Sequence, residues 1–133
     1  MVETPAQLAD VIERLYESPQ LAVDTEADSL HAYPEKICLV QVAGKGFEAL
    51  IDPLAGLDLE PLWRAFGGRT LVFHGADYDL RMLRRGHDFV PDAVFDTMLA
   101  ARLTGRERFG LDALLESELG VHLEKRSQKA DWG

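Results

Sequence analysis

The stretch "KICLVQVAGKGFEALID", residues 36–52, contains two apolar segments separated by a Gly-Lys-Gly turn. Residues 36–44 are mostly apolar, which is typical of a buried strand, and residues 47–52 form the second segment. A connection this short joins antiparallel strands in a hairpin, whereas parallel strands need a long crossover. The hairpin therefore favours a mixed sheet over a flavodoxin-like sheet, which would begin with a parallel crossover.

Helices and strands alternate around this hairpin. Thr4, Pro5 and Gln7 predict the start of a helix over 4–17, with an N-cap, a proline in the first turn and a capping box. Further strands are predicted at 21–25, 70–74 and 93–97, and further helices at 58–66, 76–85, 97–104 and 110–120. This order predicts one domain over 1–133: a ribonuclease-H-like α/β fold, with an early antiparallel hairpin, later parallel β-α-β units and helices on both faces.

Composition limits the partners. The chain has 133 residues, a net charge of −9 and a single cysteine, Cys38, so no internal disulfide can form. The negative charge argues against nonspecific binding driven by phosphates, but it suits an enzyme that reaches phosphates through bound cations. No apolar stretch approaches the roughly 18 residues that span a bilayer, and the N-terminus lacks the features of a signal peptide. We expect a cytoplasmic protein without membrane association.

Two carboxylates mark the end of the first predicted strand. Asp24 and Glu26 are two residues apart, so both side chains point to the same face. Like charges this close repel unless a proton or cation lies between them, and Mg²⁺ and Mn²⁺ prefer oxygen ligands. For these two residues alone, a strand end that has simply reached solvent is the favoured explanation. We expect the chain to turn before Asp28 and leave that side chain solvated.

A second set of polar residues lies in "FHGADYDL", residues 73–80. A strand is predicted to end at His74, and Asp77 and Asp79 then fall in the first turn of a helix, where the helix dipole favours negative charge. Asp77 is expected to be solvated, while Asp79 borders the apolar stripe. Dipole stabilisation alone would account for Asp79. For His74 we favour an orienting role over direct proton transfer, although a local hydrogen bond is the commoner use.

The two sets become informative together. Sites in open α/β sheets lie outside the carboxyl ends of the strands. If the strands that precede Asp24 and Asp79 are neighbours, then Asp24, Glu26 and Asp79 converge. Three carboxylates in one place suit two-metal phosphoryl transfer.

These residues resemble a known family. The segments that carry the resemblance are "AVDTEADSLHAYPEKICLVQVA", "LIDPL", "FHGADYDLRML", "FDTMLAARLTG" and "LEKRSQKADW". In this order they resemble ribonuclease D and its relatives, the DEDD-type 3′–5′ exonucleases of the DEDDy subclass. Asp24 and Glu26 match the first motif, His74 and Asp79 match the second, and "FDT" at 95–97 matches a recurrent segment.

The resemblance implies metal-dependent hydrolysis of phosphodiesters at the 3′ end of single-stranded nucleic acid, with RNA favoured. Two divalent cations, Mg²⁺ or Mn²⁺, would be bound by Asp24, Glu26 and Asp79. Asp96 would act as a structural or supporting acid. Substrate contacts are assigned to Thr25, Leu30, His31 and His74.

The chain departs from the family after "DW". The family has a third motif, Tyr-x-x-x-Asp, which supplies a fourth acid and a tyrosine that orients water, whereas this sequence ends at Gly133. We therefore expect an incomplete active site with impaired turnover. The missing helix would also expose apolar surface, through which we expect a homodimer.

Two other functions stay open at this stage. The chain could be a catalytically dead exonuclease-fold module that binds nucleic acid or a protein, or a metal-dependent phosphatase. Arginines 81, 84 and 85 cluster on one predicted helix, and arginines 102, 106 and 108 flank a loop. They could guide phosphates, but complementing a helix C-terminus or lying in a solvated loop is the commoner use.

Overall fold

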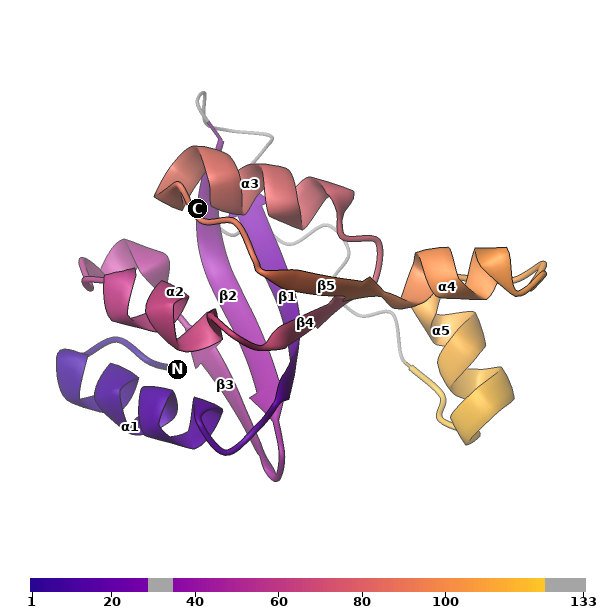
Figure 1. Ribbon diagram of the computed structural model, residues 1–133, viewed down its shortest axis with the longest axis horizontal. Helices are drawn as coiled ribbons and strands as arrows, with labels where there is room; N and C mark the ends of the chain where they lie inside the picture. The colour runs from indigo at the N-terminus through magenta and orange to yellow at the C-terminus, as the bar shows by residue number, and fades with distance from the viewer. Residues whose placement is uncertain (29–34, 124–133) are drawn as a thin grey trace.

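The computed structural model describes residues 1–28 and 35–123 (Figure 1). Its centre is a five-stranded sheet in the order β3-β2-β1-β4-β5. The strands are β1 (Gln20–Asp28), β2 (Lys36–Gly44), β3 (Phe47–Ile51), β4 (Thr70–Phe73) and β5 (Ala93–Asp96). The pairs β1–β2 and β2–β3 are antiparallel, while β1–β4 and β4–β5 are parallel. The mixed sheet predicted from the hairpin is thus confirmed.

The helices surround this sheet unevenly. They are α1 (Pro5–Leu15), the short 3₁₀ helix η1 (Pro53–Ala55), α2 (Glu60–Phe66), α3 (Asp77–His87), α4 (Thr97–Leu103), α5 (Leu111–Leu114) and the π-helical turn η2 (Leu115–Leu119). Figure 1 shows that α4 and α5 extend from the end of β5, away from α1 and α2. None of the helices in the described ranges is long and apolar enough to cross a membrane.

One face of the sheet forms the core. Along β1 the side chains alternate, so that Leu21, Val23 and Thr25 are buried while Ala22 and Asp24 are exposed. The buried side packs against α1, α2 and α3; its members include Leu8 and Leu15, Leu62 and Phe66, and Met82 and Leu83. Fully burying one such leucine contributes about 1.5–3 kcal/mol, so this layer accounts for much of the stability.

The other face is largely uncovered among the described residues. We call it the open face and define it by Ala22, Asp24, Gln41, Ala43, Glu48, Leu50 and Val72, which line a hollow of about 930 Å³. Thr97 at the start of α4 and Leu111 of α5 border the same hollow. Helical segments therefore lie on both sides of the sheet, as expected, and Val11 of α1 borders the same hollow.

Two local expectations were wrong. Strand β1 continues through Asp28, which is half-buried rather than solvated, after a register irregularity between Glu26 and Ala27. Helix α3, predicted over 76–85, continues past Gly86 to His87, and Asp88 takes the left-handed conformation with φ of 50°. The aromatic contact of His87 with Trp63 offsets the cost of about 1 kcal/mol for a glycine inside a helix.

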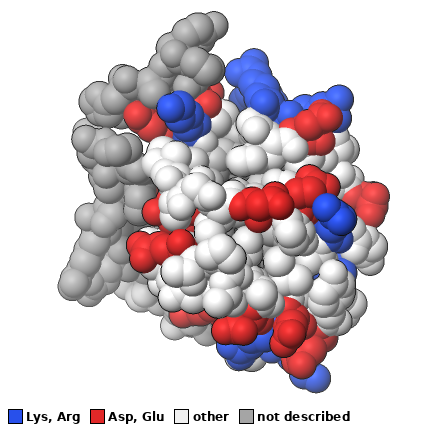
Figure 2. Space-filling view, turned by 90° about the vertical axis from the view of Figure 1, so that its left-hand side faces the viewer, with Lys and Arg blue, Asp and Glu red and all other residues white. Residues whose placement is uncertain are grey.

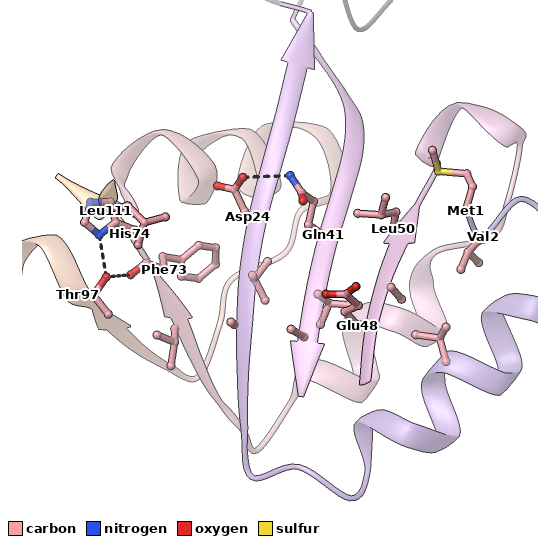
Figure 3. A pocket seen from close by; sticks show the side chains of 17 residues that line it. Met1, Val2, Asp24, Gln41, Glu48, Leu50, Phe73, His74, Thr97 and Leu111 are labelled. Carbon is pink, nitrogen blue, oxygen red and sulfur yellow. Dashed lines mark hydrogen bonds between the residues drawn. The ribbon is translucent and has the colours of Figure 1, made fainter. Parts of the chain in front are cut away.

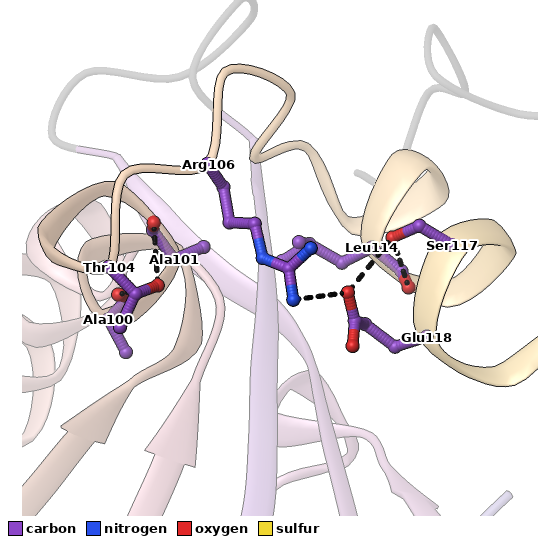
Figure 4. A network of polar contacts seen from close by, with 7 residues as sticks. All are labelled: Ala100, Ala101, Thr104, Arg106, Leu114, Ser117 and Glu118. Atoms are coloured by element: carbon purple, nitrogen blue, oxygen red, sulfur yellow. Dashed lines mark hydrogen bonds and ion pairs between the residues drawn. The ribbon is translucent and has the colours of Figure 1, made fainter.

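The segment after α4 is held by polar contacts. The Arg106 guanidinium lies 2.7 Å from a carboxylate oxygen of Glu118, which joins the loop after α4 to η2 (Figure 4). The Thr104 hydroxyl donates to the carbonyl oxygens of Ala100 and Ala101 and closes the end of α4. These contacts fix where α5 lies, although most of its leucines are not fully buried.

Candidate active site

Two of the predicted acids lie at the carboxyl end of β1. Asp24 projects onto the open face, where one of its oxygens accepts a hydrogen bond of 3.3 Å from the Gln41 amide of β2 (Figure 3). Glu26, two residues further along, is half-buried, and the strand register shifts directly after it. The hairpin therefore supplies a polar partner for Asp24 that the acidic motif alone does not reveal.

The third acid reaches the same strand from a helix. Asp79, in the first turn of α3, is only 7% exposed. Its Oδ1 accepts two hydrogen bonds from Thr25, one from the backbone N–H at 3.0 Å and one from the hydroxyl at 2.7 Å. The Thr25 hydroxyl is thus buried against Asp79, and its expected contact with substrate stays a prediction.

Asp24, Glu26 and Asp79, which we call the acidic centre, act on one another electrostatically. Burial raises the pKa of Asp24 above its usual value, and the charge of Asp79 adds to this, although the Thr25 N–H and His74 oppose it. Burial also raises the pKa of Glu26, followed by the charges of Asp24 and Asp79. The parallel pairing of β1 with β4 brings these carboxylates together from distant parts of the sequence.

His74 is fixed by a neighbouring threonine. Its Nδ1 lies 2.9 Å from the Thr97 hydroxyl, and that hydroxyl donates to the Phe73 carbonyl oxygen at 3.0 Å (Figure 3). Because the hydroxyl has one proton and gives it to Phe73, Nδ1 of His74 is the donor to Thr97. In the neutral ring Nε2 is then the acceptor. His74 also lines the hollow of the open face together with Asp24.

Asp96 ties the turn between β4 and α3 to the start of α4. Its carboxylate accepts hydrogen bonds from the backbone N–H groups of Gly75, Ala76, Met98 and Leu99. Burial raises its pKa, but these four bonds outweigh that effect and the pKa is lowered overall. The turn needs Gly75, whose φ is +82°, and a Cβ there would lie 3.0 Å from the Met98 methyl carbon. Asp96 thereby fixes the backbone of the two residues that follow His74.

The carboxylates of this site are ligands that a divalent cation prefers, but their present positions are not those of a metal site. Three carboxylates in mutual repulsion would be stabilised by a hard cation, which prefers oxygen ligands. Within residues 1–28 and 35–123, however, no group of three or more His, Cys, Asp or Glu side chains is arranged to hold a metal ion. Both Thr25 bonds use Oδ1 of Asp79, so they do not occupy its Oδ2.

Other predicted residues lie elsewhere. Leu30 and His31 are outside the described residues, as are Asp131 and Trp132 of the "DW" segment. Arginines 81 and 84 form exposed ion pairs on α3, with Asp77 at 2.9 Å and with Asp88 at 3.4 Å. Two neighbours of the site were missed, Gln41 and Thr97. Pairing the predicted hairpin with β1 would have placed Gln41 opposite Asp24.

The comparisons place this geometry in a class. The family model described as 3′-5′ exonuclease matches residues 1–133, so the chain belongs to the 3′–5′ exonuclease family. The resemblance to ribonuclease D is confirmed: the chain is 35% identical over 136 residues to ribonuclease D from Gluconacetobacter diazotrophicus, an alignment that covers 99% of this chain and 35% of the relative. It is also 36% identical over 126 residues to DNA polymerase I from Aquifex aeolicus, covering 95% of this chain and 21% of the relative.

Solved structures agree on the fold. Escherichia coli RNase D has a TM-score of 0.91 at 30% identity, with 99% of this chain and 36% of that chain covered. Brucella melitensis NrnC with bound Mg²⁺ has a TM-score of 0.74 at 28% identity, with 88% of this chain and 59% of that chain covered. The predicted fold class is confirmed by these matches. The chain spans about a third of the length of the ribonuclease D relatives.

Proposed function

We propose that this chain forms the catalytic part of a 3′–5′ exonuclease that shortens single-stranded nucleic acid, with RNA favoured. The observation that carries the proposal is the acidic centre, in which Asp79 of α3 is bound to Thr25 between Asp24 and Glu26. Membership of the exonuclease family supports the reaction, and the ribonuclease D relatives support RNA. A structure of Brucella melitensis NrnC bound to pGG supports a short single-stranded ligand.

Two divalent cations, Mg²⁺ or Mn²⁺, are proposed as cofactors, with Asp24, Glu26 and Asp79 as the residues that would hold them. Such ions supply a hydroxide nucleophile at neutral pH and stabilise the leaving oxygen. The raised pKa values of Asp24 and Glu26 support this proposal, because a cation would relieve the repulsion that raises them. The relative with bound Mg²⁺ supports the choice of ion.

The residues around the acidic centre are proposed to orient it. Gln41 fixes one oxygen of Asp24, and Thr25 holds Asp79 against the strand. His74, whose Nδ1 is committed to Thr97, would present Nε2 toward a terminal phosphate or sugar. Leu30 and His31 are retained as proposed substrate contacts, and Asp96 as the acid that positions the turn.

Turnover by the described residues is proposed to be slow. No three of their His, Cys, Asp or Glu side chains are arranged to hold an ion, so part of the binding energy of a cation would be spent on rearranging the acidic side chains. The same observation favours a second candidate, a non-catalytic exonuclease-fold module that binds nucleic acid or a protein. The exposed apolar side chains of the open face are proposed to support a homodimer.

Incubating the chain with a 5′-labelled single-stranded RNA and Mn²⁺ tests the proposal. We expect a ladder that shortens from the 3′ end with the wild type and no ladder with Asp24→Ala. Asp77→Ala is the matched control, since it removes an exposed acid two residues before Asp79 and should keep the ladder. Binding of the RNA without cleavage by any of the three proteins would favour the non-catalytic module.

A thermal-unfolding series with Mn²⁺ tests the cation site separately from turnover. A ligand that binds only the native state raises the melting temperature in proportion to its binding. Wild type should show this shift and Asp24→Asn should lose most of it. An identical shift in both proteins would remove Asp24 from the proposed ligands.

A further inference from the structure

A second hollow lies on the helical side of the sheet. It has a volume of about 590 Å³ and is lined by residues of β2, η1 and the C-terminal half of α3, among them Lys36, Ile37, Leu54, Met82, Arg85 and His87. Figure 2 shows Lys and Arg side chains along the upper edge of the face formed by α1 and α2, at the height of α3 in Figure 1. The acidic side chains occupy much of the middle of that face.

This hollow lies at the same end of the sheet as the acidic centre. Lys36 of β2 lies opposite Asp28 of β1 in the strand register, and Asp28 is two residues beyond Glu26. Arg85 lies on α3, six residues after Asp79, which corresponds to about 9 Å along a helix axis. Because Asp24 projects onto the open face, a strand bound at the acidic centre would have to pass around this end of the sheet to reach the hollow.

Two basic side chains, Lys36 and Arg85, line the hollow. Lys36 and Arg85 are exposed, and neither forms an ion pair with any residue in the described ranges. Neighbouring Arg81 and Arg84, by contrast, each pair with an acid on their own helix. Glu35 also lines the hollow, so two cations face one carboxylate there. This excess of positive charge stands out on a chain with a net charge of −9.

The floor of the hollow is apolar and aromatic. Ile37 and Met82 are 4% and 2% exposed. The His87 ring centroid lies 4.9 Å from that of Trp63, and burial lowers the pKa of His87, so this ring is neutral at neutral pH. The His87 ring, which is only half-buried, gives a base an aromatic surface to contact while the phosphate meets Lys36 and Arg85.

We propose that this hollow binds an upstream nucleotide of the single-stranded substrate, with Lys36 and Arg85 contacting its phosphate. The proposal rests on the proposed function for the direction of the strand, since the 3′ end is assigned to the acidic centre. Phosphate binding in this hollow can be tested independently of the proposed function, because it needs neither a metal ion nor catalysis. The hollow would hold a longer strand in place while its terminal nucleotide is removed.

The test is fluorescence anisotropy with a 5′-labelled ten-nucleotide RNA in EDTA, at several salt concentrations. EDTA prevents cleavage, so the measurement reports binding alone. Each phosphate contact on a single strand contributes about 0.7 to the slope of log affinity against log salt. Both side chains are proposed to contact the same phosphate, so the double variant Lys36→Gln, Arg85→Gln should lower the slope by about 0.7 and weaken binding at least fivefold at low salt. A parallel titration with a dinucleotide should show a smaller loss, because it is too short to occupy both places.

Arg84→Gln is the matched control, because it removes one positive charge from the residue next to Arg85 but one that is paired with Asp88. Its slope should match that of the wild type. Equal losses from Arg84→Gln and Arg85→Gln, or an unchanged slope in the double variant, would overturn the proposal. Thermal melts of each variant guard against misfolding, and Arg85→Lys, which keeps the charge, should retain most of the affinity.

The two proposals can fail separately. If the wild type binds the RNA through Lys36 and Arg85 but forms no ladder in Mn²⁺, the binding site stands and the exonuclease proposal falls. If a ladder forms while binding is insensitive to both substitutions, the exonuclease proposal stands and this one falls.

Discussion

The hydroxyl of Thr25 and the carboxylate of Asp79 lie 2.7 Å apart, although 54 residues separate them in the sequence. Both side chains are only 7% exposed. The bond joins the central strand to α3 at the place where the three carboxylates meet, so one threonine supports the stability of the fold and the arrangement of the site together.

Replacing Thr25 with valine keeps the shape of the side chain and removes its hydroxyl. A buried hydrogen bond to a charged group contributes about 1.5–3 kcal/mol, so Thr25→Val should lower the free energy of unfolding by about that amount. Urea denaturation measures this. Thr104→Val is the control, since its hydroxyl bonds to carbonyl oxygens at the exposed end of α4 and its loss should cost about 1 kcal/mol or less. Equal losses in the two variants would mean that the Thr25 bond has no special weight.

Neutralising Asp24 should stabilise the protein while it abolishes activity. Burial and the charge of Asp79 raise the pKa of Asp24 above 3.8, so the native state holds this proton more tightly than the unfolded chain. Ionised Asp24 therefore lowers the free energy of unfolding above its raised pKa, and this cost disappears as the pH falls below 3.8.

In EDTA at pH 7, Asp24→Asn should thus unfold at a higher urea concentration than the wild type. The difference should shrink as the pH approaches 4. Glu13→Gln removes one charge from an exposed position of α1 and should show no comparable gain. A gain in Asp24→Asn that is the same at every pH would contradict the electrostatic explanation.

Neutralising Asp96 should destabilise the protein, the opposite of the effect expected for Asp24. Its Oδ2 accepts from the Ala76 N–H, and an amide NH₂ placed there would face another donor. Asp96→Asn should therefore cost about 1–3 kcal/mol of unfolding free energy at pH 7. Because the pKa of Asp96 is lowered, its contribution is complete above pH 3.8 and is lost as the pH falls through the lowered value.

Asp92→Asn is the matched control for Asp96. The Asp92 carboxylate accepts one backbone hydrogen bond, from the Gly68 N–H at 2.8 Å. Asp92→Asn should therefore lower the free energy of unfolding by less than Asp96→Asn does. Loss of RNA cleavage in Asp96→Asn with unchanged unfolding would contradict a positioning role that acts through the turn.

The open face should drive self-association. Leu50 is 42% exposed on this face and lies one residue from Ala49 and two from Glu48. Leu50→Glu would place a second carboxylate near Glu48 and should shift any dimer toward monomer. Sedimentation at several concentrations measures the shift, and Leu103→Glu, at a leucine of α4 that is 79% exposed, serves as the control. A wild type that is monomeric at every concentration would remove the proposed dimer.

Local patterns predicted much of the fold because the relevant interactions are close in sequence. The Thr4–Gln7 capping box is present, and β2 has the predicted bounds of 36–44. The end predicted for α3 was wrong because the tilted contact of the His87 ring with Trp63 is a tertiary contact, which no local pattern reveals. Nothing local marks the change from α- to π-helix at Leu115.

The acidic centre was predicted only in part. The spacing of Asp24 and Glu26 gave their shared face, but the position of Asp79 depends on the parallel pairing of β1 with β4, which no short pattern encodes. The role of Thr25 was missed for the same reason, since its partner comes from a distant helix. Asp96 was identified by the family segment, whereas its four backbone bonds became visible only in three dimensions.

The repulsion within the acidic centre also has a dynamic consequence. Any local opening that lifts α3 from β1 separates Asp79 from Asp24 and Glu26 and relieves their repulsion, so the cation-free protein gains electrostatically from such opening. An ion bound between the strand and the helix would reverse this preference and hold α3 down. Because Arg85 lies on the same helix, cation binding at one end of α3 would also steady the hollow at its other end.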